Sequence, residues 1–355
     1  MTVSRRTLLS ALSVFAFEGC TTTSDDDFQG TELGEEDVLW TFQADGRVPT
    51  SPLLTDVAVI VGSEDGFLRA LDRGDGTVRW EFSTNGAIWS HPTLYAKTVY
   101  FGSRDGSLYA VSSTGDERWK FAAGDGIWSN PDVVDSIVYV GSADGRVHAL
   151  DATTGGERWR FETSATVAAG PTFSDGTVYI GSRDDSFYAL DAAAGRLSWQ
   201  FRTGGDISVD AAVTEDSVYF GSDDESFYCL DRADGTERWS TDVGTTINSS
   251  PTIAHDTVYF GNMNGTLFAL DPRTGEERWR NAALHGTINC DPAVVDGIVY
   301  VGDLRGYLHA FDAETGEHYW RFRTGNAVHS TPAVTDEAIY FGSNDSYLYA
   351  LERRR

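Results

Sequence analysis

Hydrophobic and polar residues alternate along most of the chain with a period of two, and short turns interrupt the alternation. The stretch 138–151 is an example, because two apolar runs there flank a Ser-x-Asp-Gly turn, as in a β-hairpin. A turn at residues 154–156 leads to another strand at 157–161, and residues 171–176 supply a short strand and a tight turn before the next unit. No useful length of sequence has helical periodicity. The pattern predicts four short strands in roughly forty residues.

Two residue columns recur along the chain at this same spacing. One column is a glycine that ends an apolar strand, and the other is a tryptophan. The glycine column contains Gly62, Gly102, Gly141, Gly181, Gly221, Gly261, Gly302 and Gly342. The tryptophan column contains Trp40, Trp80, Trp119, Trp159, Trp199, Trp239, Trp279 and Trp320. Regular repetition of a four-stranded unit predicts an all-β, eight-bladed β-propeller with four-stranded blades.

The first and last units are incomplete in complementary ways. Residues 38–42 read as an outer strand with no hairpin before it, and residues 339–351 read as a hairpin with no tryptophan strand after it. We therefore expect the N- and C-terminal strands to pair within one blade, which closes the ring and removes open sheet edges. The predicted propeller spans residues 38–355.

The N-terminal segment has the features of an export signal. Arg5 and Arg6 precede a short apolar run at residues 8–17, which is too short to span a bilayer. Paired arginines after a serine resemble a twin-arginine signal. Residues 1–19 are therefore predicted to be a signal peptide of the twin-arginine type.

The residues after this signal predict a membrane anchor. Gly19-Cys20 resembles a lipoprotein cleavage site, although Phe17 and Glu18 depart from the usual pattern, and Cys20 is the expected lipidated residue. Residues 20–37 are polar and acidic and predict a flexible tether. We expect an extracytoplasmic protein that is lipid-anchored to the outer face of the cytoplasmic membrane.

The charge of the chain restricts its partners. The sequence has 27 Lys+Arg against 54 Asp+Glu, a net charge of -27, so no nucleic-acid partner is expected. The basic residues are arginines except for Lys97 and Lys120, and such a surface resembles that of haloarchaeal and other salt-loving proteins; a generally acidic extracellular protein is the alternative. Apart from Cys20, the cysteines are Cys229 and Cys290, which we expect to be small, buried and not bridged.

The run Ala-Leu-Asp-x-x-x-Gly-x-x-x-Trp at residues 189–199 resembles the tryptophan-docking motif of the PQQ-like (quinoprotein) propeller repeat. The resemblance covers residues 38–355. It implies that the tryptophans are structural, each with its indole N–H bound to a backbone acceptor. We expect a recurring aspartate to tie the turn that follows it, not to act in catalysis. This aspartate column contains Asp72, Asp151, Asp191, Asp231, Asp271 and Asp312.

The same family includes quinone-dependent dehydrogenases and BamB-like lipoprotein scaffolds. A lipid-anchored propeller with little outside its blades looks most like the scaffolds, so we expect a surface scaffold with a protein or peptide partner and no catalytic residues. A PQQ-dependent dehydrogenase is the alternative, and it would need a quinone clamp, a metal and a catalytic Asp. The adjacent cysteines typical of those enzymes are absent from the sequence, and Asp210, Asn289 and Asp291 have no spacing diagnostic of a Ca²⁺ site. We therefore expect no cofactor, neither PQQ nor Ca²⁺, and no metal site.

Function is expected in the columns that vary between blades. The loop before each innermost strand and the Ser-x-Asp-Gly turn should share one face of the ring. Trp89 and Trp128 are the tryptophans outside the docking column, and they fall in adjacent blades near the channel mouth. The candidate patch on this face comprises Trp89, His91, Trp128, Asn130, Asp210, Asn248, Asn289, Asp291, Arg305 and His329.

Two alternatives remain for this patch. The aromatic side chains could simply fill a narrow channel. Arg305, which replaces the Asp or Asn of the other turns, could hold an anion or a partner carboxylate, or it could be a neutral surface change.

Overall fold

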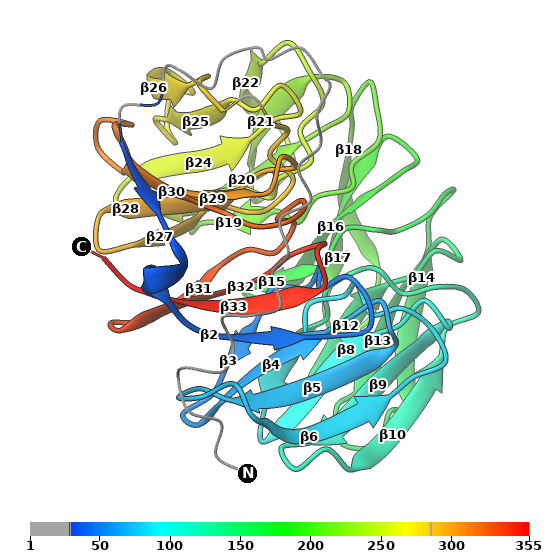
Figure 1. Ribbon diagram of the computed structural model, residues 1–355. Helices are drawn as coiled ribbons and strands as arrows, with labels where there is room; N and C mark the ends of the chain where they lie inside the picture. Colours follow the sequence, from blue (N-terminus) through cyan, green and yellow to red (C-terminus); the bar gives the residue numbers. More distant parts are fainter. Residues whose placement is uncertain (1–27, 29, 285, 355) are drawn as a thin grey trace, which may run out of the picture.

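The computed structural model describes residues 28, 30–284 and 286–354. This part of the chain forms eight sheets that are arranged around a ring, with the chain passing from one sheet to the next (Figure 1). Each sheet is one antiparallel blade of four strands, and one sheet has an additional parallel strand at its edge. The prediction of an eight-bladed, all-β propeller is confirmed.

Blades 1 to 4 follow one another directly in the sequence. Blade 1 contains β3 (Leu53–Leu54), β4 (Ala58–Gly62), β5 (Phe67–Asp72) and β6 (Val78–Ser83). Blade 2 contains β7 (Thr93–Tyr95), β8 (Thr98–Gly102), β9 (Ser107–Ser112) and β10 (Glu117–Ala122). Blade 3 contains β11 (Asp132–Val134), β12 (Ile137–Gly141), β13 (Arg146–Asp151) and β14 (Glu157–Glu162). Blade 4 contains β15 (Thr172–Ser174), β16 (Thr177–Ser182), β17 (Ser186–Asp191) and β18 (Leu197–Arg202).

Blades 5 to 8 complete the ring. Blade 5 contains β19 (Ala212–Val213), β20 (Ser217–Gly221), β21 (Ser226–Asp231) and β22 (Glu237–Asp242). Blade 6 contains β23 (Thr252–Ala254), β24 (Thr257–Gly261), β25 (Leu267–Leu270) and β26 (Glu277–Asn281). Blade 7 contains β27 (Ala293–Val295), β28 (Ile298–Gly302), β29 (Tyr307–Asp312), β30 (His318–Arg323) and the added β1 (Thr31–Leu33). Blade 8 contains β31 (Ala333–Val334), β32 (Ala338–Gly342), β33 (Tyr347–Glu352) and β2 (Val38–Gln43).

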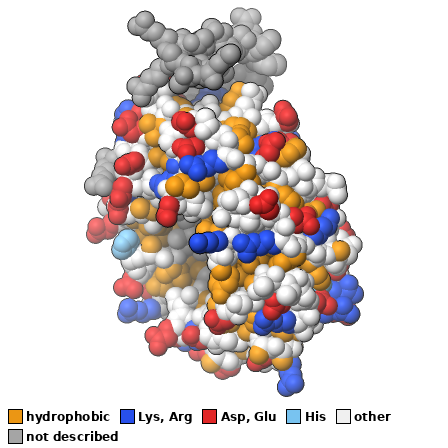
Figure 2. All heavy atoms as spheres, turned by 90° about the horizontal axis from the view of Figure 1, so that it is seen from below, with side chains coloured by type: hydrophobic (Ala, Val, Ile, Leu, Met, Phe, Trp, Pro, Cys, Tyr) orange, Lys and Arg blue, Asp and Glu red, His pale blue; other side chains and the backbone are white. Residues whose placement is uncertain are grey.

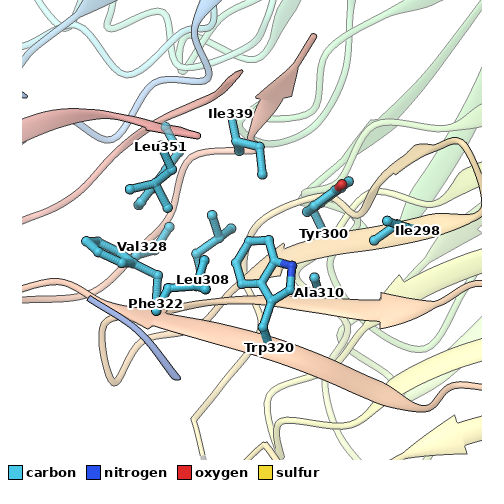
Figure 3. Close-up of a cluster of buried hydrophobic side chains, with 11 residues drawn as sticks. Ile298, Tyr300, Leu308, Ala310, Trp320, Phe322, Val328, Ile339 and Leu351 are labelled. Atoms are coloured by element: carbon cyan, nitrogen blue, oxygen red, sulfur yellow. The ribbon is translucent and has the colours of Figure 1, made fainter. Parts of the chain in front are cut away.

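The second and third strands of each blade are buried on both faces because the blades pack face to face. Every residue of β8 is buried, whereas the outer strand β6 is mostly exposed or half-buried. A strand that is covered on both faces reads as a continuous apolar run. The core is therefore a series of clusters between neighbouring blades, and Figure 3 shows the cluster in which Trp320 and Leu308 of blade 7 face Ile339 and Leu351 of blade 8.

The docking tryptophans link each blade to the next, as expected. In seven of the eight, the indole Nε1–H donates to a backbone carbonyl of the following blade at 2.9–3.1 Å. The aspartate column also has the expected role: Asp151 Oδ1, for example, accepts the backbone N–H groups of Thr153 and Thr154 in the turn that follows. Cys229 and Cys290 are buried and free.

Strands from the two ends of the chain close the ring. β2 pairs antiparallel with β33, with Thr41 opposite Tyr349, and Figure 1 shows the blue strand alongside the red one. A hydrogen bond from Thr331 N–H to Ser51 Oγ, at 2.9 Å, crosses the same junction at the inner edge of the ring. The predicted closure is confirmed.

The predicted tether is wrong for its last residues. β1 pairs parallel with β30, Leu33 is only 5% exposed, and a short 3₁₀ helix (η1, Glu35–Asp37) leads into β2. One apolar side chain in an acidic segment gave too weak a pattern to reveal this edge strand. The signal peptide and Cys20 lie outside the described residues, so these predictions stay untested. No helix in the described part of the chain is long and apolar enough to cross a membrane.

The glycine column is needed where a blade meets the loop before the next one. A Cβ built on Gly181 would overlap Ile207 Cγ2, which Ile207→Ala removes, and would lie 2.8 Å from Ile207 Cβ. We expect Gly181→Ala to lower the free energy of unfolding by about 2 kcal/mol or more. In a double-mutant cycle measured by denaturant unfolding, the loss of unfolding free energy in Gly181→Ala/Ile207→Ala should be smaller than the sum of the losses in the two single variants.

Gly156 offers a matched control, because the only nearby atom that a Cβ would meet there is Thr154 Oγ1, at 3.4 Å. Gly156→Ala should be close to neutral. Additive losses in the cycle would contradict the close contact between Gly181 and Ile207.

Candidate functional site

A cavity of about 630 Å³ opens at the mouth of the central channel. Nine of the ten predicted patch residues line this channel-mouth pocket, and Arg305 does not. The nine are Trp89, His91, Trp128, Asn130, Asp210, Asn248, Asn289, Asp291 and His329. The structure therefore brings together residues from six blades that are far apart in the sequence.

Two loops of each blade supply the lining, and they share one face as expected. The loop before the innermost strand carries Trp89 and His91 in blade 2 and the equivalent residues elsewhere. The Ser-x-Asp-Gly turn lies beside it, since the N–H of Arg104 in that turn donates to the Ala87 carbonyl at 2.9 Å. Repetition of this pairing around the ring places equivalent side chains around one opening.

Hydrogen bonds join the inner column of the pocket around the channel. In each of six cases, the backbone N–H of one column residue donates to the side chain of the column residue in the next blade. These bonds run from His91 to Asn130, Gly170 to Asp210, Asp210 to Ser250, Ser250 to Asp291, Asp291 to Thr331 and Thr331 to Ser51. Ser51 Oγ and His91 Nε2, 3.3 Å apart, continue the chain of contacts. Much of the inner column thus holds neighbouring blades together.

Asp210 is the most constrained member of this ring. One of its oxygens accepts the Gly170 N–H, and the other accepts the side-chain amide of Asn130 at 2.9 Å, two blades away. Glycine in blade 4 makes this reach possible, because a Cβ on Gly170 would lie 2.7 Å from Asp210 Oδ2. Both carboxylate oxygens are therefore occupied by donors from the protein itself.

Burial shifts the titration of the pocket floor toward neutral forms. It raises the pKa of Asp210, and, with the added repulsion of the Asp210 charge, it raises the pKa of Asp291 to about 7. Burial also lowers the pKa of His91 to about 4 and lowers that of His329. Near neutral pH both histidines are uncharged, and the floor carries less charge than its residue types suggest.

Aromatic and guanidinium groups form one wall of the pocket. The Arg104 guanidinium lies 5.9 Å from the ring centroid of Trp89 and 5.8 Å from that of Trp128, and Arg183 lies 5.6 Å from Trp128. Both tryptophans are partly exposed, and Trp89 Nε1 is buried without a hydrogen-bond partner among the described residues. We call Trp89, Arg104, Trp128 and Arg183 the arginine–tryptophan wall.

Arg104 and Arg183 were missed from the sequence, as were the lining residues Asp206 and Asp223. Arg104, Arg183 and Asp223 occupy the variable second position of the Ser-x-Asp-Gly turn. That position differs from blade to blade, so its variation could have identified these residues as candidates for the site. From the sequence, a turn stood out only where its usual Ser-x-Asp-Gly pattern is broken, as at Arg305.

The structure gives Arg305 a local explanation. In blade 2, Ser103 and Asp105 share the bonding of the turn, and Asp105 accepts the N–H of Ser107. In blade 7, Asp303 Oδ1 accepts the N–H of both Arg305 and Tyr307. Asp303 thus replaces both acceptors of the usual turn, the serine hydroxyl and the aspartate carboxylate. Arg305 is released from the turn, is exposed and lies outside the pocket. A role for Arg305 in binding an anion or a partner carboxylate stays a prediction.

The pocket residues do not fit a Ca²⁺-dependent quinone site. Both oxygens of Asp210 are taken by internal donors, and Asp291 Oδ1 accepts the Ser250 N–H at 2.7 Å. No group of three or more His, Cys, Asp or Glu side chains within residues 30–284 and 286–354 could hold a metal ion. We therefore derive no reaction step through such a group.

The raised pKa of Asp291 predicts a pH-dependent stability. Between pH 4 and 7 the folded state holds a proton that the unfolded state has lost, so the free energy of unfolding falls as pH rises through this window. Asp291→Asn keeps an oxygen for the Ser250 N–H but does not ionise. We expect it to match the wild type near pH 4 and to be about 1–2 kcal/mol more stable at pH 8, by denaturant unfolding.

The exposed Asp56 provides a control, because Asp56→Asn should leave the pH profile unchanged. An Asp291→Asn variant that is no more stable than the wild type at pH 8 would show that the carboxylate ionises at no cost.

Solved structures share this fold at low sequence identity. BamB from Moraxella catarrhalis is 21% identical, with a TM-score of 0.78 over 88% of this chain and 98% of that chain. The computationally designed Ika8 protein is 18% identical, with a TM-score of 0.81 over 89% and 100% of the two chains. Quinohemoprotein alcohol dehydrogenase ADHIIG from Pseudomonas putida HK5 is 15% identical, with a TM-score of 0.73 over 93% and 79%. At these identities the likeness shows the fold alone.

Two family models match the sequence. The one described as "Outer membrane protein assembly factor BamB" matches residues 31–125, and the one described as "Beta-alanine-activating enzyme, beta-propeller" matches residues 135–354, more than half of the chain. No curated protein matches the chain in sequence. The protein is a PQQ-like β-propeller, and it belongs to the family described as the beta-propeller of the beta-alanine-activating enzyme.

Proposed function

We propose that this propeller is a non-enzymatic binding scaffold whose channel-mouth pocket docks a protein or peptide partner. The observation that carries the proposal is the pair Trp89 and Trp128, partly exposed in one pocket and both in contact range of the Arg104 guanidinium. Trp and Arg dominate the energetics of protein interfaces because they bury much surface and bind in several ways.

The remaining polar residues of the pocket support a scaffold over a catalyst. Asp210 accepts the Asn130 amide and the Gly170 N–H, and the His91 imidazole contacts Ser51 Oγ, so these side chains already have partners within the protein. The arginine–tryptophan wall supplies the aromatic and guanidinium surface of the pocket. The partial match to the BamB family model and the likeness to a BamB structure also favour a scaffold.

The same proposal includes a place in the cell. Export by the N-terminal signal and a lipid on Cys20 would hold the ring outside the cytoplasmic membrane, joined through the acidic residues that precede β1. The partner would then be a surface or secreted protein.

Affinity capture from the native membrane tests the docking site. The double variant Trp89→Ala/Trp128→Ala should lose its partner, because truncation of two central aromatic side chains costs about 2 kcal/mol each in interfaces. Leu197 on the outer strand β18 is 47% exposed, and Leu197→Ala should capture the same partner as the wild type. An unchanged partner list for the tryptophan variant would place the docking surface elsewhere.

A quinone-dependent oxidoreductase is the second candidate. The observation in its favour is the likeness to quinohemoprotein alcohol dehydrogenases, including the Comamonas testosteroni enzyme, with a TM-score of 0.74 over 92% of this chain. Addition of PQQ and Ca²⁺ should leave both the melting temperature and dye-linked alcohol oxidation unchanged if the scaffold proposal is right. A rise in either would support the enzyme.

A further inference from the structure

We propose that the arginine–tryptophan wall binds a carboxylate that stands beside an apolar side chain in an acidic segment of the partner. This inference rests on the proposed function, since it names the chemistry of the segment that the channel-mouth pocket takes. The carboxylate meets the guanidinium groups of Arg104 and Arg183, and the apolar side chain covers the faces of Trp89 and Trp128.

The first support is that both guanidinium groups are available. Arg104 and Arg183 are exposed, and in the described part of the chain neither has a carboxylate within 4.0 Å. Arg183 Nε donates to Ser208 Oγ at 3.1 Å, which leaves its terminal nitrogens for a ligand. Some arginines on the outer strands are paired instead: Arg79 lies 2.6 Å from Asp72, and Arg158 lies 2.7 Å from Asp151.

The second support is that the wall is arranged in advance. The Arg104 guanidinium lies within cation–π distance of both tryptophan rings, and this attraction restricts its planar group, so less side-chain entropy is lost on binding. Guanidinium groups pair with carboxylates through two parallel hydrogen bonds. Trp89 Nε1, buried and without a partner among the described residues, offers a further donor.

The charge around the wall restricts where a carboxylate can bind. Asp206 and Asp223 also line the pocket, and burial together with the Asp206 charge raises the pKa of Asp223, although the Arg183 charge acts in the opposite direction. With a net charge of -27, the protein repels anions over most of its surface, and Figure 2 shows acidic side chains scattered across the visible face. A carboxylate therefore gains most beside Arg104, where repulsion is opposed by the nearest positive charges.

The volume of the pocket points to a short segment as the occupant. About 630 Å³ accommodates a few side chains and not a folded domain. A carboxylate and a neighbouring apolar side chain from one peptide would use both components of the wall. A neutral or basic segment would leave the two guanidinium groups without partners.

Immobilised heptapeptides test this chemistry directly. Each peptide carries a central Phe-Asp, Phe-Asn or Phe-Lys in the same sequence, and binding of the fluorescently labelled full chain is read at constant ionic strength. We expect Phe-Asp to bind about tenfold more tightly than Phe-Asn, and Phe-Lys to bind least. Arg104→Gln/Arg183→Gln should bind Phe-Asp and Phe-Asn equally.

A charge-matched control separates the wall from the overall charge. Arg273 and Arg305 are exposed and lie outside the pocket, so Arg273→Gln/Arg305→Gln changes the net charge equally and should keep the preference for Phe-Asp. Equal binding of Phe-Asp and Phe-Asn by the wild type overturns the inference. It is also overturned if no peptide binds, or if the preference survives in Arg104→Gln/Arg183→Gln.

Failure of the inference can be told apart from failure of the proposed function. Suppose that capture of the partner depends on Trp89 and Trp128 but that the peptides show no carboxylate preference. The carboxylate inference is then wrong, and the proposed docking site is retained. If the partner is captured without these tryptophans, the proposed docking site is wrong as well.

Discussion

The indole of each docking tryptophan lies between two blades, and in seven of the eight its N–H donates to a carbonyl of the next blade, as Trp159 does to Ala192 at 2.9 Å. The indole packs against strands that are already buried on their other face, so each blade depends on both of its neighbours. A blade removed from the ring would expose apolar surface on two sides. The functional face depends on this coupling, because its loops are positioned only when adjacent blades are in register.

The channel-mouth pocket shows that variation between repeats has two origins. His91, Asn130, Asp210 and Asp291 differ from blade to blade, yet most of their polar atoms serve contacts between blades. Asn130, Asp210 and Asp291 each accept a backbone N–H of the preceding blade, and His91 contacts a hydroxyl there instead. The arginine–tryptophan wall differs because the Arg104 guanidinium and Trp89 Nε1 have no hydrogen-bond partner among the described residues. Function is therefore better sought in side chains without internal partners than in columns that merely vary.

The sequence was sufficient for the fold because the glycine and tryptophan columns repeat with one spacing and the end units complement each other. It also placed nine patch residues around one opening, since equivalent loop positions in a ring must converge. It left the role of Arg305 open, and the structure shows that Asp303 accepts both backbone N–H groups of that turn. Arg104 and Arg183 were overlooked because their turns keep the usual Ser and Asp, and only contact with the tryptophan rings singles them out. The N-terminal signal and the lipid on Cys20 remain predictions.

Closure by strands from opposite ends of the chain also sets an order of events during synthesis. Ser51 and Thr331 meet across the junction although 280 positions separate them, and β2 is made long before β33 exists to pair with it. Blades 1 to 7 can form as hairpins while the chain emerges, but the open ring exposes β2 and one apolar blade face until the last strand arrives. Such a distant contact is slow to form because a long loop must close first. The interval before closure is thus the period in which the nascent protein is most exposed to aggregation and proteolysis.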